Sequence, residues 1–193
     1  EYAYPLEASV REKIEAVVPT LEQGGNMHFY YNPVSDEIRK MCWNQGDWRF
    51  YKYYRQWQWK TYLMAKDICE KEKIDVLHQL NMIGFREPGY LWKLSKENGV
   101  PFVWGPIGGL KQFPTAYLKE AGLKMQLFMR LKNFLNIWQL KHEKRVDEAL
   151  KTAKLLISSI PDSYRALKKY KGLESIVIPE TGCFLSEDIS TSR

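Results

Sequence analysis

Four polar residues that can do chemistry gather around a short apolar run in the middle of the chain. Residues 74–79 have the composition of a buried strand, and His78 and Asn81 lie near its carboxyl end. A histidine there can hydrogen-bond a hydroxyl or phosphate or act as a general base; a core histidine with satisfied hydrogen bonds is the equal alternative. Arg86 can fork onto a phosphate or carboxylate, or pair with Glu87, whose position also suits a helix N-terminus.

A glycine-rich loop follows the next apolar run. Residues 100–104 predict a buried strand, and the chain then turns through Gly105, Gly108 and Gly109. Glycines let a backbone turn sharply and approach a ligand, and ligands of open parallel sheets bind beyond the carboxyl ends of strands. The loop is neither a Walker loop nor a dinucleotide fingerprint, because its spacing differs and no Lys-Ser/Thr follows. A tight turn without a ligand is the alternative.

Two further stretches combine suitable residue types. Residues 48–60 interleave aromatic side chains with cations, which can stack on bases or lie at a membrane interface; a packed helix face with a solvated rim is the alternative. Glu180, Thr181 and Gly182 follow another predicted strand end, where a plain turn is the alternative. No catalytic triad order, zinc-helix motif or carboxylate cluster occurs in the sequence. We therefore expect the chain to carry part of a site.

The elements that must position these residues alternate between strand and helix. This order, with crossovers long enough for parallel pairing, predicts an α/β fold: a doubly wound, mostly parallel sheet flanked by helices. We expect strands at 27–31, 74–79, 100–104, 155–158 and 175–178, and helices at 6–18, 47–72, 88–96, 112–120, 123–152 (with one break) and 161–169.

Composition narrows the class of protein. The 193 residues are 45% hydrophobic and 27% charged, as expected for one globular domain with a sizeable core. No run approaches the length of a membrane span. Three widely spaced cysteines argue against a disulfide framework and against a zinc site. The net charge of +6 permits a polyanionic partner, such as nucleic acid, an anionic membrane or a phosphorylated ligand, without choosing among them.

In this order the motifs resemble the N-terminal, acceptor-binding domain of a GT-B-fold glycosyltransferase, in the retaining family called group 1 or family four. The resemblance spans residues 6–183, and its most specific element is the strand and glycine loop at 99–109. The other matching stretches are residues 74–78, 86–92, 153–159 and 177–182. The resemblance implies that residues 1–185 form this Rossmann-like domain, with its first strand missing before Glu1. Residues 186–193 would be a linker towards a C-terminal donor domain.

The resemblance also implies the activity and the site. The parent enzyme would transfer a hexosyl group from a nucleotide-sugar to a hydroxyl of a glycan or lipid-linked acceptor, in polysaccharide biosynthesis in a bacterial cytoplasm. His78, Asn81, Arg86, Glu87, Gly105, Gly108 and Gly109 would line the acceptor side, with His78 as the candidate catalytic residue, and Glu180, Thr181 and Gly182 would lie at the donor-facing hinge. No metal is required, and the chain alone would hold no cofactor and be inactive.

Two departures and one rival accompany this interpretation. Many relatives place a histidine where Ile107 stands, and the common Pro-Asn-Gly close is Pro179-Glu180-Thr181 here.

The basic charge and residues 48–60 could also dock the protein on the anionic inner face of a membrane. The rival is a non-catalytic α/β module that binds single-stranded nucleic acid or another polyanion through residues 48–60.

Overall fold

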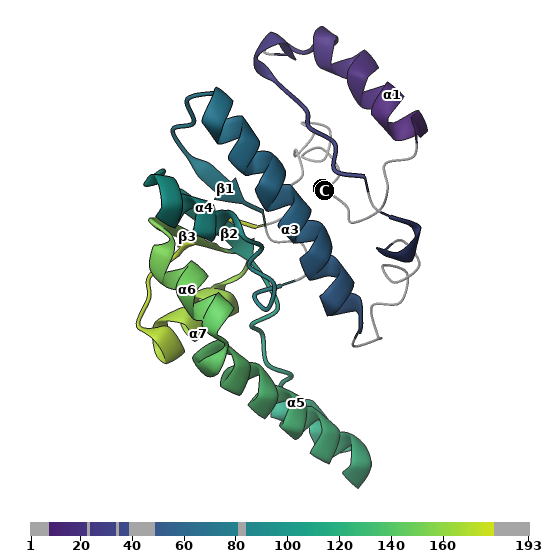
Figure 1. Ribbon diagram of the computed structural model, residues 1–193. Helices are drawn as coiled ribbons and strands as arrows, with labels where there is room; N and C mark the ends of the chain where they lie inside the picture. Colours follow the sequence, from purple (N-terminus) through teal and green to yellow (C-terminus); the bar gives the residue numbers. More distant parts are fainter. Residues whose placement is uncertain (1–7, 23, 34, 39–48, 81–83, 180–193) are drawn as a thin grey trace, which may run out of the picture. The chain divides into compact units, whose positions relative to one another are not determined.

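The computed structural model describes residues 8–22, 24–33, 35–38, 49–80 and 84–179 (Figure 1). By their contacts the described residues divide into two compact units, which are considered separately. The first consists of the chain up to Ile74 together with Gly89–Leu94, and the second of Asp75–Pro88 and the chain from Ser95 onward. The helices and strands are, in chain order, α1 (Ala8–Val17), η1 (Val18–Thr20), η2 (Gly24–Asn26), α3 (Arg49–Lys71), β1 (Leu77–Gln79), α4 (Leu91–Asn98), β2 (Phe102–Ile107), η3 (Thr115–Leu118), α5 (Leu123–His142), α6 (Lys144–Thr152), β3 (Leu155–Ser158), α7 (Pro161–Lys171) and β4 (Ile176–Val177).

The first unit is built around α3, whose bounds agree with the predicted long helix. Phe50, Tyr54 and Trp57 recur at steps of three and four and are buried, as the periodicity predicts for a helix face turned inward. Their rings pack in sequence, with Phe50 and Tyr54 stacked at 5.8 Å between centroids. The aromatic side of this helix is therefore mainly core.

The predicted strand at 27–31 is wrong. Within the ranges that the structure describes, the segment has no strand partner. Its Tyr30 and the adjacent Asn32 instead bond to α3 and to Glu72, the residue after α3. Asn32 donates to the Trp57 carbonyl (3.2 Å) and receives a bond from the Trp57 indole (3.1 Å), and Tyr30 Oη donates to Glu72 (3.0 Å). Aromatic residues favour an extended backbone, but a strand also requires a neighbouring ladder of backbone groups, which this segment lacks.

The second unit contains the sheet. Among the described residues, β1, β2, β3 and β4 form one parallel sheet in that order. His78 pairs with Val103, Trp104 with Leu156, and Ser158 with Val177. The α/β class and the parallel pairing are confirmed. A doubly wound sheet also needs a reversal of strand order, which the described strands do not contain, so that part of the expectation stays a prediction.

Apolar side chains of the inner strands form the core of this unit. Phe102, Trp104 and Ile107 on β2 are fully buried, as are Val146 on α6 and Leu167 on α7. A strand covered on both faces has a nearly continuous apolar sequence, which explains why the run at 100–104 was recognisable.

β2 extends three residues beyond its predicted end, to Ile107. Its register to β3 shifts between Trp104 and Ile107. A Cβ on Gly105 would lie 2.3 Å from the Ile157 carbonyl oxygen, so only glycine fits there. Gly105 is thus required for the contact between β2 and β3, and the strand continues through a residue that the sequence predicts as loop.

The bounds of α4 and α7 differ from the predictions, since α4 ends at Asn98 instead of 96 and α7 ends at Lys171 instead of 169. α4 begins at Leu91 instead of 88, because the preceding residues form a turn in which Glu87 N–H donates to the Gly84 carbonyl. The expected helix at 112–120 is the short 3-10 turn η3. The long helix at 123–152 breaks once, at Glu143, into α5 and α6, as predicted.

Candidate functional site

The carboxyl ends of β1 and β2 lie side by side in the second unit. Gln79, the last residue of β1, pairs with Trp104. The segments that follow the two strands also meet, because Phe85 N–H donates to the Gly108 carbonyl at 3.1 Å. The two constellations predicted from the sequence therefore belong to one edge of the sheet. Asn81 lies outside the described residues.

His78 connects β1 with the glycine loop. It is an exposed residue, and its Nε2 lies 2.8 Å from the Gly105 carbonyl oxygen. A carbonyl can only accept, so the ring donates through Nε2–H. In the neutral ring this leaves the lone pair on Nδ1. His78 thus presents a nitrogen that can accept a proton or a hydrogen bond from a hydroxyl.

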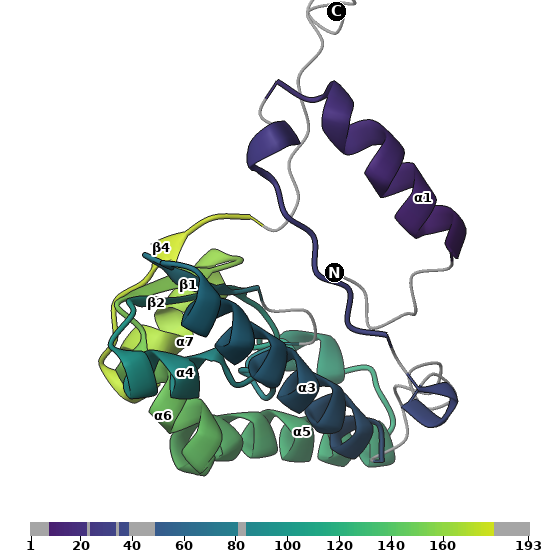
Figure 2. The same ribbon diagram turned by 45° about the horizontal axis from the view of Figure 1, so that its top comes forward.

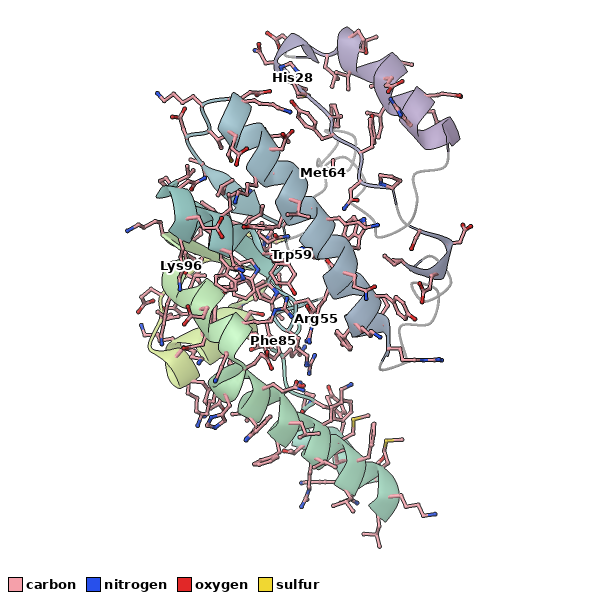
Figure 3. The ribbon with its side chains drawn as sticks, in the orientation of Figure 1. His28, Arg55, Trp59, Met64, Phe85 and Lys96 are labelled. Atoms are coloured by element: carbon pink, nitrogen blue, oxygen red, sulfur yellow. The ribbon has the colours of Figure 1, made fainter. Side chains whose placement is uncertain are left out.

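The backbone of the glycine loop is close to the segment after β1. Gly109 has a φ of +75°, and a Cβ there would lie 3.4 Å from the Gly84 Cα. The ring of the buried Phe85, which is labelled in Figure 3, lies 3.9 Å from the same position. Glycine is needed because of the left-handed backbone and because of the close approach. Gly108 is half-buried, and Gly109 is exposed.

Arg86 is directed towards α5. Its Nε donates to Gln139 at 2.5 Å, and its Nη2 donates to Asn136. Its guanidinium also lies 5.0 Å from the centre of the Phe85 ring. The arginine therefore holds the loop after β1 against α5, and two of its nitrogens are already used.

Glu87 is buried and paired with a different residue from the one that the sequence suggested. Its side chain has no exposed surface, and Arg145 of α6 donates to its Oε2 at 3.0 Å. A buried carboxylate needs such a partner because the loss of hydration is otherwise uncompensated. Arg86 and Glu87 thus tie the loop to two different helices.

Two serines at the carboxyl end of β3 take part in the same edge, and the sequence analysis missed them. Ser159 donates from its backbone N–H (3.2 Å) and its Oγ (3.0 Å) to the Ile107 carbonyl. The Ser158 and Ser175 hydroxyls lie 2.7 Å apart. A Ser-Ser pair between an apolar strand and the Pro161 helix start was the available signal. Both serines therefore connect the carboxyl end of β3 to its neighbours, Ser159 to Ile107 of β2 and Ser158 to Ser175, which lies just before β4.

The predicted donor-facing residues Glu180, Thr181 and Gly182 lie outside the described residues. The chain that precedes them reaches the same edge, because Ile178 N–H donates to the Ser158 carbonyl at 2.9 Å after β4 ends at Val177.

The aromatic and basic residues of α3 belong to the first unit. Trp59, labelled in Figure 3, stacks on Tyr62 at 4.8 Å and meets Tyr90 edge-on at 5.2 Å. The Lys93 ammonium lies 5.0 Å from the centre of the Trp59 ring. These rings are occupied by each other and by a cation, which limits the surface left for stacking a base.

Within the part of the chain that the structure describes, no group of three or more His, Cys, Asp or Glu side chains is arranged to hold a metal ion. None of the described helices combines the length and the apolar composition required to cross a membrane. Comparison of the chain with protein-family models, with curated proteins and with solved structures found no match.

Proposed function

We propose that this chain is the acceptor-binding domain of a glycosyltransferase that resembles the retaining GT-B enzymes of group 1, or family four. In this proposal the domain is the Rossmann-like N-terminal half of the enzyme. A donor domain in the same parent chain holds the nucleotide-sugar, which is a co-substrate and not a resident cofactor. The reaction joins a hexosyl group to a hydroxyl of a glycan or lipid-linked acceptor and releases the nucleoside diphosphate.

The observation that carries the proposal is the position of His78 beside Gly105 of β2, just before the glycine loop that contains Gly108 and Gly109. The ends of parallel strands are where ligands of α/β sheets bind. There, His78 donates to Gly105 and keeps Nδ1 for a hydroxyl. The motifs at this edge follow one another in the order that the resemblance predicts.

In the reaction, the acceptor hydroxyl oxygen bonds to the anomeric carbon while the bond from that carbon to the diphosphate breaks. In our proposal His78 Nδ1 accepts a hydrogen bond from this hydroxyl, orients it, and takes its proton as the new bond forms. The glycine backbone lets the acceptor approach closely. The resemblance implies retention of the anomeric configuration and no requirement for a metal.

The other site residues take different roles in this proposal. Arg86 and Glu87 are positioning residues, because their hydrogen bonds to α5 and α6 fix the loop that faces Gly108. Asn81 stays a candidate for the acceptor side, and Glu180, Thr181 and Gly182 stay candidates for the donor-facing hinge. The proposed setting is a bacterial cytoplasm, peripheral to the membrane, in polysaccharide biosynthesis.

The test is a transfer assay on the full-length parent protein. The protein is incubated with a panel of nucleotide-sugars, with and without extracted glycans and lipid-linked acceptors, and nucleoside diphosphate release is followed. We expect release from one donor, stimulated by one acceptor class, with the labelled sugar recovered on that acceptor. Absence of transfer from every donor, with a folded protein, would contradict the proposal.

The polyanion-binding module remains the second hypothesis from the sequence. The structure offers it less support, since Phe50, Tyr54 and Trp57 are buried and Trp59 is stacked. It predicts binding of single-stranded nucleic acid that falls steeply as salt rises. Such binding by the parent protein, without sugar transfer, would favour the module.

A further inference from the structure

α5 exposes more large apolar side chains than an ordinary surface helix does. Figures 1 and 2 show it leading away from α6, with its N-terminal part beyond the strands. Eight large apolar side chains on it are 43–83% exposed: Leu123, Met125, Leu127, Phe128, Leu131, Phe134, Leu135 and Trp138. A helix that covers a core normally buries such residues and exposes its polar ones.

The side of α5 that faces the rest of the unit carries amides. Asn133 bonds to both the N–H and the carbonyl of Phe113, each at 2.9 Å. Asn136 and Gln139 accept the bonds from Arg86. Gln126 donates to the Ala121 carbonyl at 2.8 Å. These hydrogen bonds and the buried Leu140 hold the helix by one side, which leaves the exposed apolar residues of the other side for another surface.

Six of these exposed residues form one continuous stripe: Leu127, Phe128, Leu131, Phe134, Leu135 and Trp138. Successive residues of a helix are rotated by about 100°, so positions separated by three, four, seven and eight share a face. Leu131 lies at the centre of the stripe. Its neighbours Arg130 and Lys132 therefore lie about 100° to either side, one cation along each border. No acidic residue occurs between Leu123 and His142, and Lys124 and Lys141 stand near the two ends.

Charge decides which occupant fits this stripe. A second copy of the chain, packed stripe to stripe, would bring the cations of two helices together with no carboxylate on either helix to pair with them. An anionic bilayer provides both parts of the match, since the apolar stripe enters the boundary of the acyl chains and the cations meet the lipid headgroups. A tryptophan near the end of the stripe also suits such an interface.

We propose that α5 is an in-plane membrane helix that docks this protein on an anionic lipid surface through the stripe from Leu127 to Trp138. The docking site is thus on α5 and not on the aromatic residues of α3. The inference stands on α5 alone and does not depend on the transferase activity.

The test is co-sedimentation of the purified chain with phosphatidylcholine vesicles, with and without phosphatidylglycerol. We expect binding only when the anionic lipid is present. Replacing three stripe residues together (Leu127→Gln, Leu131→Gln and Phe134→Gln) should weaken binding by roughly a hundredfold, because three partly inserted side chains lose their apolar transfer. The double variant Arg130→Gln/Lys132→Gln should weaken it by roughly twentyfold.

A matched control replaces three equally exposed apolar residues of the first unit: Val17→Gln, Leu21→Gln and Leu63→Gln. This variant should bind vesicles like the unchanged protein, and circular dichroism should show all variants folded. Equal binding by the stripe variant would overturn the proposal. So would a concentration-dependent dimer, measured by analytical ultracentrifugation, that the stripe variant abolishes while no vesicle binds.

Discussion

Arg145 donates to Glu87 at 3.0 Å, and the carboxylate that it neutralises has no exposed surface. This pair joins α6 to the loop that begins at Gly84 and lies against the carbonyl of Gly108. The position of the glycine loop thus depends on an ion pair that lies away from the sheet edge. Glu87, which the sequence places at the acceptor side, therefore affects the glycine loop through the backbone of residues 84–87 and not by direct contact.

The variant Arg145→Met should lower the free energy of unfolding by about 3 kcal/mol or more, because it removes the guanidinium that pairs with a buried carboxylate. Urea unfolding followed by circular dichroism measures the loss. The control is Arg165→Met, whose exposed pair with Asp162 should contribute at most about 0.5 kcal/mol. Equal losses for the two variants would contradict a stabilising role for the pair between Arg145 and Glu87.

The variant Gly105→Ala should destabilise the second unit by at least about 3 kcal/mol, because the added methyl group would overlap the Ile157 carbonyl. Thermal and urea unfolding measure the effect. Gly25→Ala is the matched control, since a Cβ there meets nothing within 4 Å. It should change stability by less than about 0.5 kcal/mol. A tolerated Gly105→Ala would mean that β2 and β3 are further apart than described.

The third prediction concerns pH and Asp147 on α6. Hydrogen bonds from Lys151 and Lys171 hold the pKa of this carboxyl below its ordinary value of 3.8. A carboxyl with a lowered pKa in the folded state stabilises the fold above its unfolded pKa and loses that contribution as pH falls through the folded pKa.

The free energy of unfolding of the unchanged protein should therefore exceed that of Asp147→Asn by about 1 kcal/mol near neutral pH, and the difference should shrink as the pH falls below 3.8 and through the lowered pKa. Unfolding curves across this range give the difference directly. Glu120→Gln, at an exposed position, serves as the control and should show a small difference. If the difference in free energy of unfolding between the unchanged protein and Asp147→Asn persisted at the lowest pH, the ion pairs could not be its cause.

The elements predicted most accurately were those whose signals are local. β3 occupies the predicted residues because a run of three apolar residues and a serine, Leu155–Ser158, ends shortly before the helix that starts at Pro161. The segment at 27–31 failed because an aromatic sequence specifies an extended backbone but not a neighbouring strand. β2 extends beyond its predicted end because the contact of Gly105 with Ile157 is tertiary, and no local sequence pattern encodes it.

The sequence predicted which strand ends carry the candidate site, but not which residues its side chains bond to. His78 and the glycine loop could be assigned to strand ends, and in a parallel sheet such ends share an edge. The partners of Arg86 and Glu87 could not be foreseen, because Asn136, Gln139 and Arg145 lie about fifty residues away in sequence. The outward stripe of α5 was also hidden, since apolar residues occur on nearly every side of that helix.

The most direct test of the proposed function is the kcat/KM of the parent enzyme for its acceptor in the variant His78→Asn. His28→Asn is the control, an exposed histidine of the first unit (Figure 3). The account predicts a loss of about a hundredfold for His78→Asn, because the group that orients the acceptor hydroxyl is removed. It predicts no change for His28→Asn. Equal kcat/KM for His78→Asn and the unchanged enzyme would contradict it.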